Sequence, residues 1–129
     1  MLAEAQALVE SAANCLAAAE SLQEADGHRQ LVEDFLNQTL EDADEADQLM
    51  ERALEEELAA GKAEAAAGQA AAGAGVSVTL GAEQLAVRAD SQATEAKQLI
   101  TGEKDREARM LRSRCDDIRW QAQLLLSRM

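Results

Sequence analysis

The sequence contains no proline and no tyrosine, and it has a single phenylalanine and a single tryptophan. Because proline breaks helices, its absence is compatible with long uninterrupted helices, which the abundance of alanine favours. Because aromatic side chains are nearly absent, the core has to be built from leucine, valine, isoleucine, methionine and alanine. Such a core buries little apolar area per residue. We therefore expect an elongated bundle or coiled coil and not a compact globule.

Cysteine and histidine are also scarce. The two cysteines, Cys15 and Cys115, form no CxxC pair, which excludes a zinc ribbon and a thioredoxin-like redox motif. The single histidine, His28, cannot supply the paired Glu-x-x-His motifs of a di-iron bundle. The acidic run EDADEAD at 41–47 lacks the glycine and the terminal glutamate of a calcium loop. We therefore expect neither a metal nor any other cofactor.

Several sequence motifs that would indicate catalysis or export are missing as well. The chain contains no GxxxxGK[ST], GxGxxG or GxSxG motif, so we expect that it is not an enzyme. No run of 18 apolar residues occurs, and the N-terminal stretch carries glutamates instead of the basic region of a secretory signal. These absences favour an intracellular protein, cytoplasmic or cytoskeletal, with reduced thiols.

Basic residues are too few to balance the acidic ones, and the formal net charge is −13. The imbalance lies almost entirely within residues 1–64, whereas residues 65–129 are close to neutral. A strongly acidic surface is unsuited to binding nucleic-acid phosphates, so we expect no nucleic acid among the partners. Two interpretations remain for the acidic half: a solvated helix face that keeps the protein soluble, or a surface for basic protein partners.

The sequence predicts three helices. Apolar residues recur every three or four positions over 1–25, and Asp26-Gly27 is typical of a helix end. A second helix is expected over 28–72, in which the alanine-rich stretch 59–75 could form either helix or flexible linker. The glycine-rich turn 73–81 precedes a third helix over 82–129, with an interruption at Thr101-Gly102. The core stripe predicted for the second helix is Leu31, Phe35 or Leu36, Leu40, Ala43, Ala46, Met50, Ala53 or Leu54, and Leu58.

The glycine-rich turn predicts how these helices pack. If the chain folds back near Ser77, Phe35 lies beside Trp120, and the acidic run at 41–51 faces the basic stretch at 104–114. The predicted fold is a single all-α domain, an antiparallel, coiled-coil-like helical hairpin. The shorter first helix completes a three-helix bundle at one end, which leaves a two-helix arm over 53–102. In this arrangement Cys15 and Cys115 are both buried, at similar heights on neighbouring parallel helices.

The basic stretch carries the candidate interaction site. Arg106, Arg109, Arg112 and Trp120 are candidates for contacting an acidic partner. The alternative is that these arginines pair within the chain with the acidic second helix.

These features favour a non-catalytic structural or protein-interaction subunit that docks into a larger assembly by helix packing. The order of helix, short connector with β-branched residues and returning helix is similar in layout to prefoldin-type chaperone subunits, although the extra N-terminal helix and the alanine-rich tip depart from that layout. The resemblance implies an alternative function, a chaperone or secretion-type clamp that grips clients with its two-helix arm. The sequence leaves the oligomeric state and the identity of the partner open.

Overall fold

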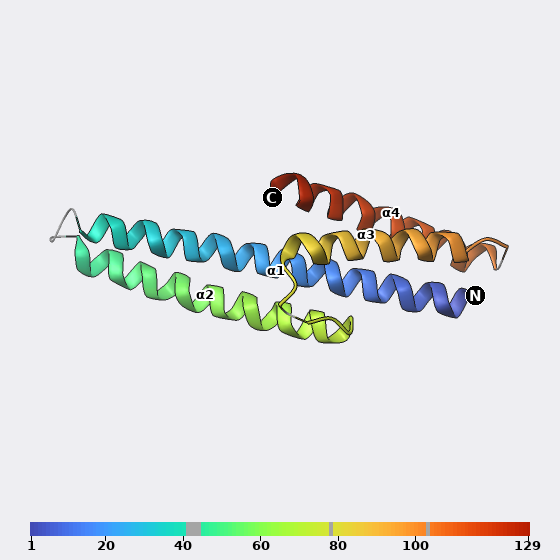
Figure 1. The fold of residues 1–129 in the computed structure, drawn as a ribbon, viewed down its shortest axis with the longest axis horizontal. Helices are drawn as coiled ribbons and strands as arrows, with labels where there is room; N and C mark the ends of the chain where they lie inside the picture. Colours follow the sequence, from blue (N-terminus) through green and yellow to red (C-terminus); the bar gives the residue numbers. More distant parts are fainter. Residues whose placement is uncertain (41–44, 78, 103) are drawn as a thin grey trace.

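A computed structural model describes residues 1–40, 45–77, 79–102 and 104–129. It contains the helices α1 (Leu2–Thr39), α2 (Ala46–Gly73), α3 (Ala82–Leu99) and α4 (Asp105–Arg128), and no strand among the described residues (Figure 1). The predicted all-helical class is confirmed. The predicted helix boundaries and the predicted hairpin are not.

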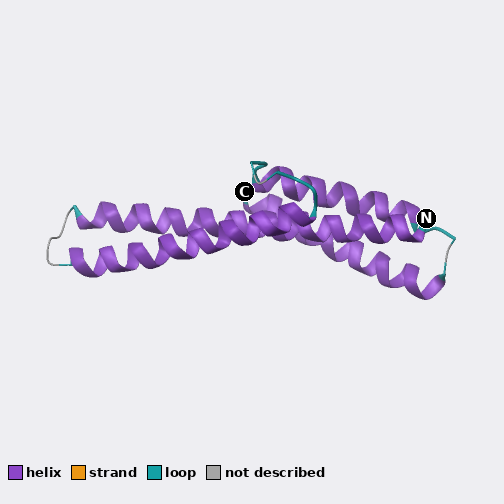
Figure 2. Cartoon of the chain, turned by 90° about the horizontal axis from the view of Figure 1, so that it is seen from below, coloured by secondary structure: helices purple, strands orange, loops and turns teal. Residues whose placement is uncertain are grey.

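The longest helix, α1, is the axis on which the other three helices pack. At 1.5 Å per residue its 38 residues span about 57 Å. Helix α2 runs back along α1 from its C-terminal end as far as Asn14, and α3 and α4 pack on the N-terminal half of α1 (Figures 1 and 2). Within the described residues, α2 packs against α1 alone. The molecule is therefore elongated, with a two-helix arm formed by α1 from about residue 21 onward together with α2, and a three-helix bundle at the other end.

The first helix continues through the position where the sequence predicts a turn. Asp26 and Gly27 lie inside α1, and Gly27 does not adopt a positive φ angle. A glycine inside a helix costs only about 1 kcal/mol relative to alanine. Ala25 and His28, on either side of it, both pack against α2, so the packing outweighs that cost. The reversal occurs instead between Thr39 and Ala46, where residues 41–44 lie outside the described residues.

The glycine-rich segment joins two helices that do not pack side by side. Gly75 adopts a φ of 70°, which glycine allows without strain, and the segment leads from the end of α2 to the start of α3. Both helices run antiparallel to α1 along different parts of its length (Figure 1). The predicted hairpin centred near Ser77 is therefore wrong. The alanine-rich stretch before it is helical as far as Gly73.

The predicted interruption at Thr101-Gly102 is present and has a larger effect than a kink. Helix α3 ends at Leu99, Gly102 adopts a φ of 90°, and α4 begins at Asp105 and runs back along α3. The predicted third helix is thus two antiparallel helices. Their pairing is fixed on the surface by Arg119 Nε, which donates to Asp90 Oδ1 at 3.2 Å, and by an ion pair between Lys97 and Asp116.

The main core lies in the three-helix bundle. Its largest fully buried side chains are Leu85, Ile100, Val9, Cys15 and Cys115. Helix α4 contributes a stripe with alternating spacings of four and three, in which Leu111, Cys115, Ile118, Ala122 and Leu125 are all buried. Met129, the next residue in the same spacing, is 48% exposed. The arm, by contrast, has a small core cluster of three alanines, Ala25, Ala60 and Ala63.

The predicted pairing of Phe35 with Trp120 is wrong. Arg119 of α4 pairs with Asp90 of α3, and Gln92 of α3 accepts a hydrogen bond from Cys15 of α1. Trp120 therefore lies level with the part of α1 just after Cys15, roughly 20 residues or about 30 Å along the axis from Phe35. Trp120 is also 62% exposed, so removing its side chain does not create a cavity in the core.

Candidate protein-interaction surfaces

The two helices of the arm meet along a seam of mostly small side chains. On α2 the residues facing α1 are spaced alternately by three and four positions, as in a coiled coil. They are Leu49, Ala53, Glu56, Ala60, Ala63 and Ala67. On α1 the matching positions are Ala18, Ser21, Ala25, His28, Val32, Phe35 and Thr39. At the two positions where the predicted core stripe offers alternatives, Phe35 and Ala53 lie in the seam, whereas Leu36 and Leu54 do not. The other large apolar residues of that stripe are exposed and lie outside the seam: Leu31, Leu40, Met50 and Leu58. Ala43 lies outside the described residues.

One polar layer interrupts the alanine seam. The imidazole Nδ1 of His28 bonds to the Glu56 carboxylate across the seam, and both side chains are about three-quarters covered. Glu24, one turn earlier on α1, lies 3.7 Å from the other ring nitrogen of His28. The hydrogen bond from the His28 ring to the Glu56 carboxylate is the main cause that raises the pKa of His28, and the charges of Glu56 and Glu24 act in the same direction. A single polar pair of this kind fixes the register of two helices.

The arm is expected to be more stable at pH 6 than at pH 8.5. A pKa that is higher in the folded state means that the folded chain holds the His28 proton more tightly than the unfolded chain. The resulting stability is fully present below the ordinary histidine value of 6.5 and is lost as the pH rises through the folded pKa. Amide hydrogen exchange of residues 46–63, compared at the two pH values after correction for intrinsic rates, measures this difference.

The control for this pH dependence is His28→Gln, which keeps a polar group in the seam but does not titrate. Its arm should open equally at both pH values, while amides of 85–99 in the bundle serve as an internal reference. An unchanged pH dependence in His28→Gln would mean that another group is responsible.

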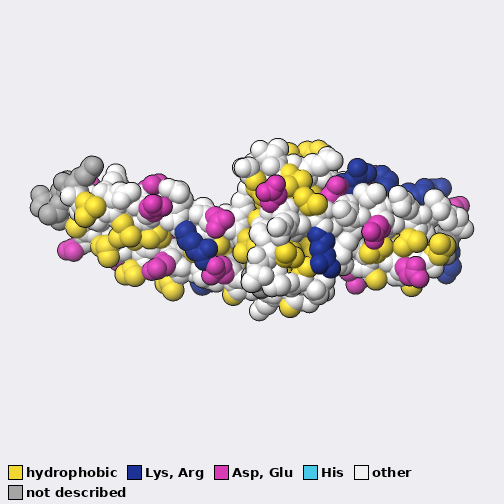
Figure 3. Space-filling view, viewed as in Figure 1, with side chains coloured by type: hydrophobic (Ala, Val, Ile, Leu, Met, Phe, Trp, Pro, Cys, Tyr) yellow, Lys and Arg dark blue, Asp and Glu magenta, His cyan; other side chains and the backbone are white. Residues whose placement is uncertain are grey.

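One side of the arm exposes large apolar side chains. They follow the seam by one or two positions: Leu36 on α1, Leu40 directly after the end of α1, and Met50, Leu54 and Leu58 on α2. Leu54 is 58% exposed and Leu58 is 69% exposed. We call this set the apolar face of the arm. In Figure 3 hydrophobic side chains gather over the arm at the left of the molecule.

A groove runs along the apolar face between α1 and α2. Its walls are formed by Arg29, Val32, Glu33 and Leu36 of α1 and by Glu57, Ala60, Gly61 and Glu64 of α2. A second hollow, lined by Leu54, Glu57 and Leu58, adjoins it through Glu57. The groove is thus apolar at its floor and bordered by carboxylates.

The opposite side of the arm is polar. Its side chains precede the seam by one position on each helix, and they are mostly charged or amide groups: Glu24, Asp34, Gln38, Gln48, Arg52, Glu55 and Lys62. Leu31 is the one large apolar residue on this side, and it is 41% exposed. The contrast between the two sides shows that the exposed leucines are gathered on one face.

The apolar face continues the side of α1 that α3 and α4 cover in the bundle. Leu8, Cys15 and Leu22 recur every seven residues on α1 and belong to or pack against the bundle core. Arg29 and Leu36 continue the same series into the arm, where Leu36 is 43% exposed. One continuous strip of α1 is therefore covered by helices near its N-terminus and left open in the arm.

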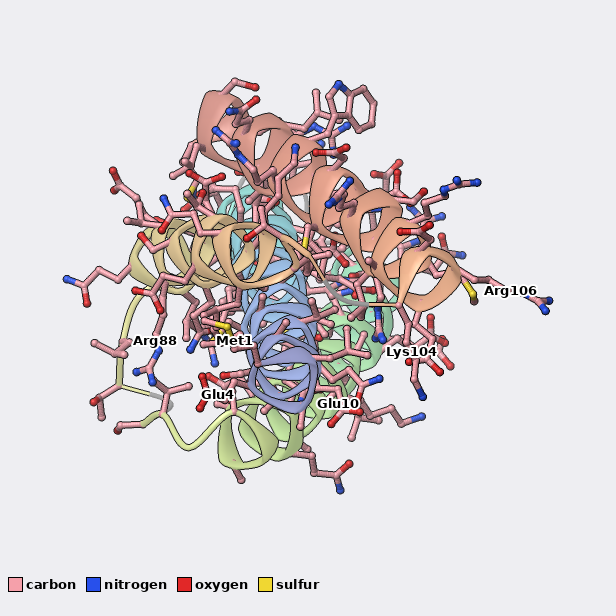
Figure 4. The ribbon with its side chains drawn as sticks, turned by 90° about the vertical axis from the view of Figure 1, so that its right-hand side faces the viewer. Met1, Glu4, Glu10, Arg88, Lys104 and Arg106 are labelled. Carbon is pink, nitrogen blue, oxygen red and sulfur yellow. The ribbon has the colours of Figure 1, made fainter. Side chains whose placement is uncertain are left out.

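The arginines proposed from the sequence lie on α4, away from the arm. Arg106, Arg109 and Arg112 are exposed and make no ion pair within the described residues, and Trp120 is exposed on the same helix. Figure 4 shows Arg106 and Lys104 at the outside of the bundle, with Arg106 pointing away from it, and Figure 3 shows basic side chains along the upper right edge. Because α4 does not contact α2, the predicted pairing of these arginines with the acidic second helix is wrong. Part of the acidic run, 41–44, lies outside the described residues.

The two cysteines are buried in the bundle, as the sequence predicts, and belong to the same core cluster. Cys15 on α1 donates a hydrogen bond to Gln92 Oε1 at 3.8 Å. Burial raises the pKa of both thiols, which keeps them protonated and poorly nucleophilic. They therefore fill the core as small apolar groups.

Comparison with protein-family models, with curated proteins and with solved structures finds no match for this chain. Among the described residues no helix is long and apolar enough to cross a membrane, and no group of three or more His, Cys, Asp or Glu side chains is placed to hold a metal ion. The two exposed surfaces described above, the apolar face of the arm and the outer side of α4, are the candidate interaction sites.

Proposed function

We propose that this chain is a non-catalytic protein-interaction subunit that docks into a larger protein assembly by helix packing. The observation that supports the proposal is the apolar face of the arm. Single exposed apolar residues are normal on protein surfaces. Here five large apolar side chains are gathered on one side of two helices, and the opposite side is polar. Gathered apolar surfaces of this kind are typical of protein-interaction sites.

The composition of the arm supports the same proposal. The core cluster of the arm is formed by three alanines, which bury little apolar area and so stabilise the two-helix pair weakly. Covering Leu36, Leu54 and Leu58, which are exposed, would bury further apolar surface. Each such side chain contributes about 1.5–3 kcal/mol on complete burial. A partner that covers these side chains would therefore stabilise the arm. We propose that such a partner is found in an intracellular location, cytoplasmic or cytoskeletal.

Site-specific photo-crosslinking tests this function. With a photoreactive benzoylphenylalanine in place of Leu54, illumination of cells that make the protein should yield one or a few discrete adducts with other proteins. The matched control places the same group at Arg52, which is on the polar side of the same helix turn. The control should yield none of those adducts. If position 54 forms no protein adduct, or the same adducts as position 52, the proposal fails.

A chaperone or secretion-type clamp is the second candidate, and the exposure of the same leucines favours it. A clamp would contact many non-native chains through Leu54, so the crosslinked products would form a broad distribution of masses enriched after heat stress. Discrete adducts that are insensitive to heat stress support the assembly subunit, and the broad distribution supports the clamp.

A further inference from the structure

We propose that the groove of the apolar face binds a basic amphipathic α-helix of another protein, which completes a three-helix layer along the arm. This proposal rests on the interaction function proposed above and names the class of partner. Its three parts are the shape of the groove, the side of α1 on which it lies, and the charge along its borders.

The floor of the groove allows another helix to approach closely. It is formed by Val32, Ala60 and Gly61, none of which has a long side chain. A Cβ atom added to Gly61 would meet nothing within 4 Å, so no packing within this chain requires a glycine there. A glycine in the middle of a helix costs about 1 kcal/mol relative to alanine. Because glycine has no side chain, Gly61 allows the backbone of a second helix to approach closely.

The position of the groove indicates that its occupant is a helix. The strip of α1 that carries Arg29 and Leu36 is the continuation of the strip that α3 and α4 cover through Cys15 and Leu22. A helix lying on the arm would therefore extend the layer that already exists in the bundle. The open strip runs from Arg29 to Leu40, which corresponds to a helix of about 12 residues, or roughly three turns.

The charges along the groove indicate that the occupant is basic. Glu33 on α1 and Glu57 on α2 border the groove on opposite sides, and neither forms an ion pair within the described residues. Glu64 lies at one end and pairs with Arg29, the one cation among the described residues that line the groove. Lysines or arginines on both flanks of an apolar stripe would pair with Glu33 and Glu57. The same two glutamates would repel an acidic helix.

The chain's own helices do not supply such an occupant. Helix α4 carries most of the exposed arginines of the described residues, but its leucine and isoleucine stripe is buried in the bundle. Its outer side carries Asp116 and Asp117 among the arginines. A second copy of the chain would thus present basic charge without the apolar stripe that the groove requires.

Two synthetic peptides of about 14 residues test the proposal, since that length spans the open strip. Both carry leucines at heptad spacing and a fluorescent label. The flanking positions are lysines in one peptide and glutamates in the other. Fluorescence anisotropy with the full chain should show the basic peptide binding at least about tenfold more tightly than the acidic one. Equal affinity, or no binding of the basic peptide, overturns the proposal.

Charge reversal locates the binding site. The double variant Glu33→Lys, Glu57→Lys should bind the acidic peptide in preference to the basic one. The control variant Asp34→Lys, Glu55→Lys changes the net charge by the same amount on the polar side of the arm, and it should keep the preference for the basic peptide. If both double variants lose that preference alike, the peptide responds to net charge and not to the groove, and the proposal is wrong.

A second experiment removes the apolar contacts. Leu36→Asp combined with Leu54→Asp should abolish binding of the basic peptide, whereas Leu31→Asp on the polar side should leave it unchanged. All three side chains are exposed, so these variants should fold. Sedimentation of the chain without peptide shows whether a second copy occupies the groove, which would overturn the proposal. If crosslinking through Leu54 still gives discrete adducts while the peptides show no charge preference, the interaction function stands and only the class of partner is wrong.

Discussion

Replacing Leu85 by alanine is expected to lower the free energy of unfolding by about 3 kcal/mol. Leu85 lies on α3, is fully buried and belongs to the core of the three-helix bundle. The substitution removes the apolar contacts of the leucine and leaves a cavity that closely packed helices cannot fully close. Because most of the neighbouring core side chains are alanines, few long side chains are available to move into the space.

The control for Leu85→Ala is Leu58→Ala, which removes the same atoms from a side chain that is 69% exposed. Its effect on stability should lie within about 0.5 kcal/mol. Chemical denaturation followed by circular dichroism measures both values. A cost at Leu58 close to that at Leu85 would mean that the apolar face of the arm is covered in the isolated protein.

The class of the fold follows from the sequence because the signals for it are local. The absence of proline and the abundance of alanine allow long helices, and the chain forms four of them within the described residues. The spacing from Leu111 to Leu125 identifies the buried side of α4, and Thr101-Gly102 identifies the break before it. These signals each depend on a few neighbouring residues.

The arrangement of the helices does not follow from the sequence, because periodicity locates a face without naming the neighbour that covers it. Helix α2 carries two stripes one residue apart, one containing Ala53 and Ala60 and the other containing Leu54 and Gly61. The sequence leaves Ala53 and Leu54 as alternatives for the core stripe, and the structure buries Ala53. The smaller residues are buried because α1 and α2 approach closely, and this approach is a tertiary property.

Of the candidate interaction surfaces, too, the sequence predicts only one. The basic stretch of α4 can be identified from charge alone, and Arg106, Arg109 and Arg112 are exposed as a contact surface requires. The apolar face of the arm was missed, because the predicted core stripe includes Leu40, Met50 and Leu58 and offers Leu36 and Leu54 as alternatives to Phe35 and Ala53. Helix α2 carries two apolar stripes, and one of them is enough to pack against its neighbouring helix α1. The second stripe is the signal that would have identified the apolar face.

Replacing Ala25 by leucine is expected to destabilise the arm by about 1–3 kcal/mol, because it overfills the seam. Ala25 is fully buried on α1, where it packs against Ala60 and Ala63 of α2. A leucine at this position adds three carbon atoms between two backbones that alanine side chains hold close together. The helices must separate there, which also strains the adjacent pair of His28 and Glu56 one turn away.

The effect of Ala25→Leu should be confined to the arm, because α2 packs only against α1 within the described residues. Amide hydrogen exchange should therefore accelerate over residues 46–66 and remain unchanged over 85–99. Ala17→Leu is the matched control, since Ala17 is an exposed position on the same helix, and its effect should stay within about 0.5 kcal/mol. If Ala25→Leu instead slows exchange in α2, the seam has room for a larger side chain. In that case the alanines of the seam do not set the distance between α1 and α2.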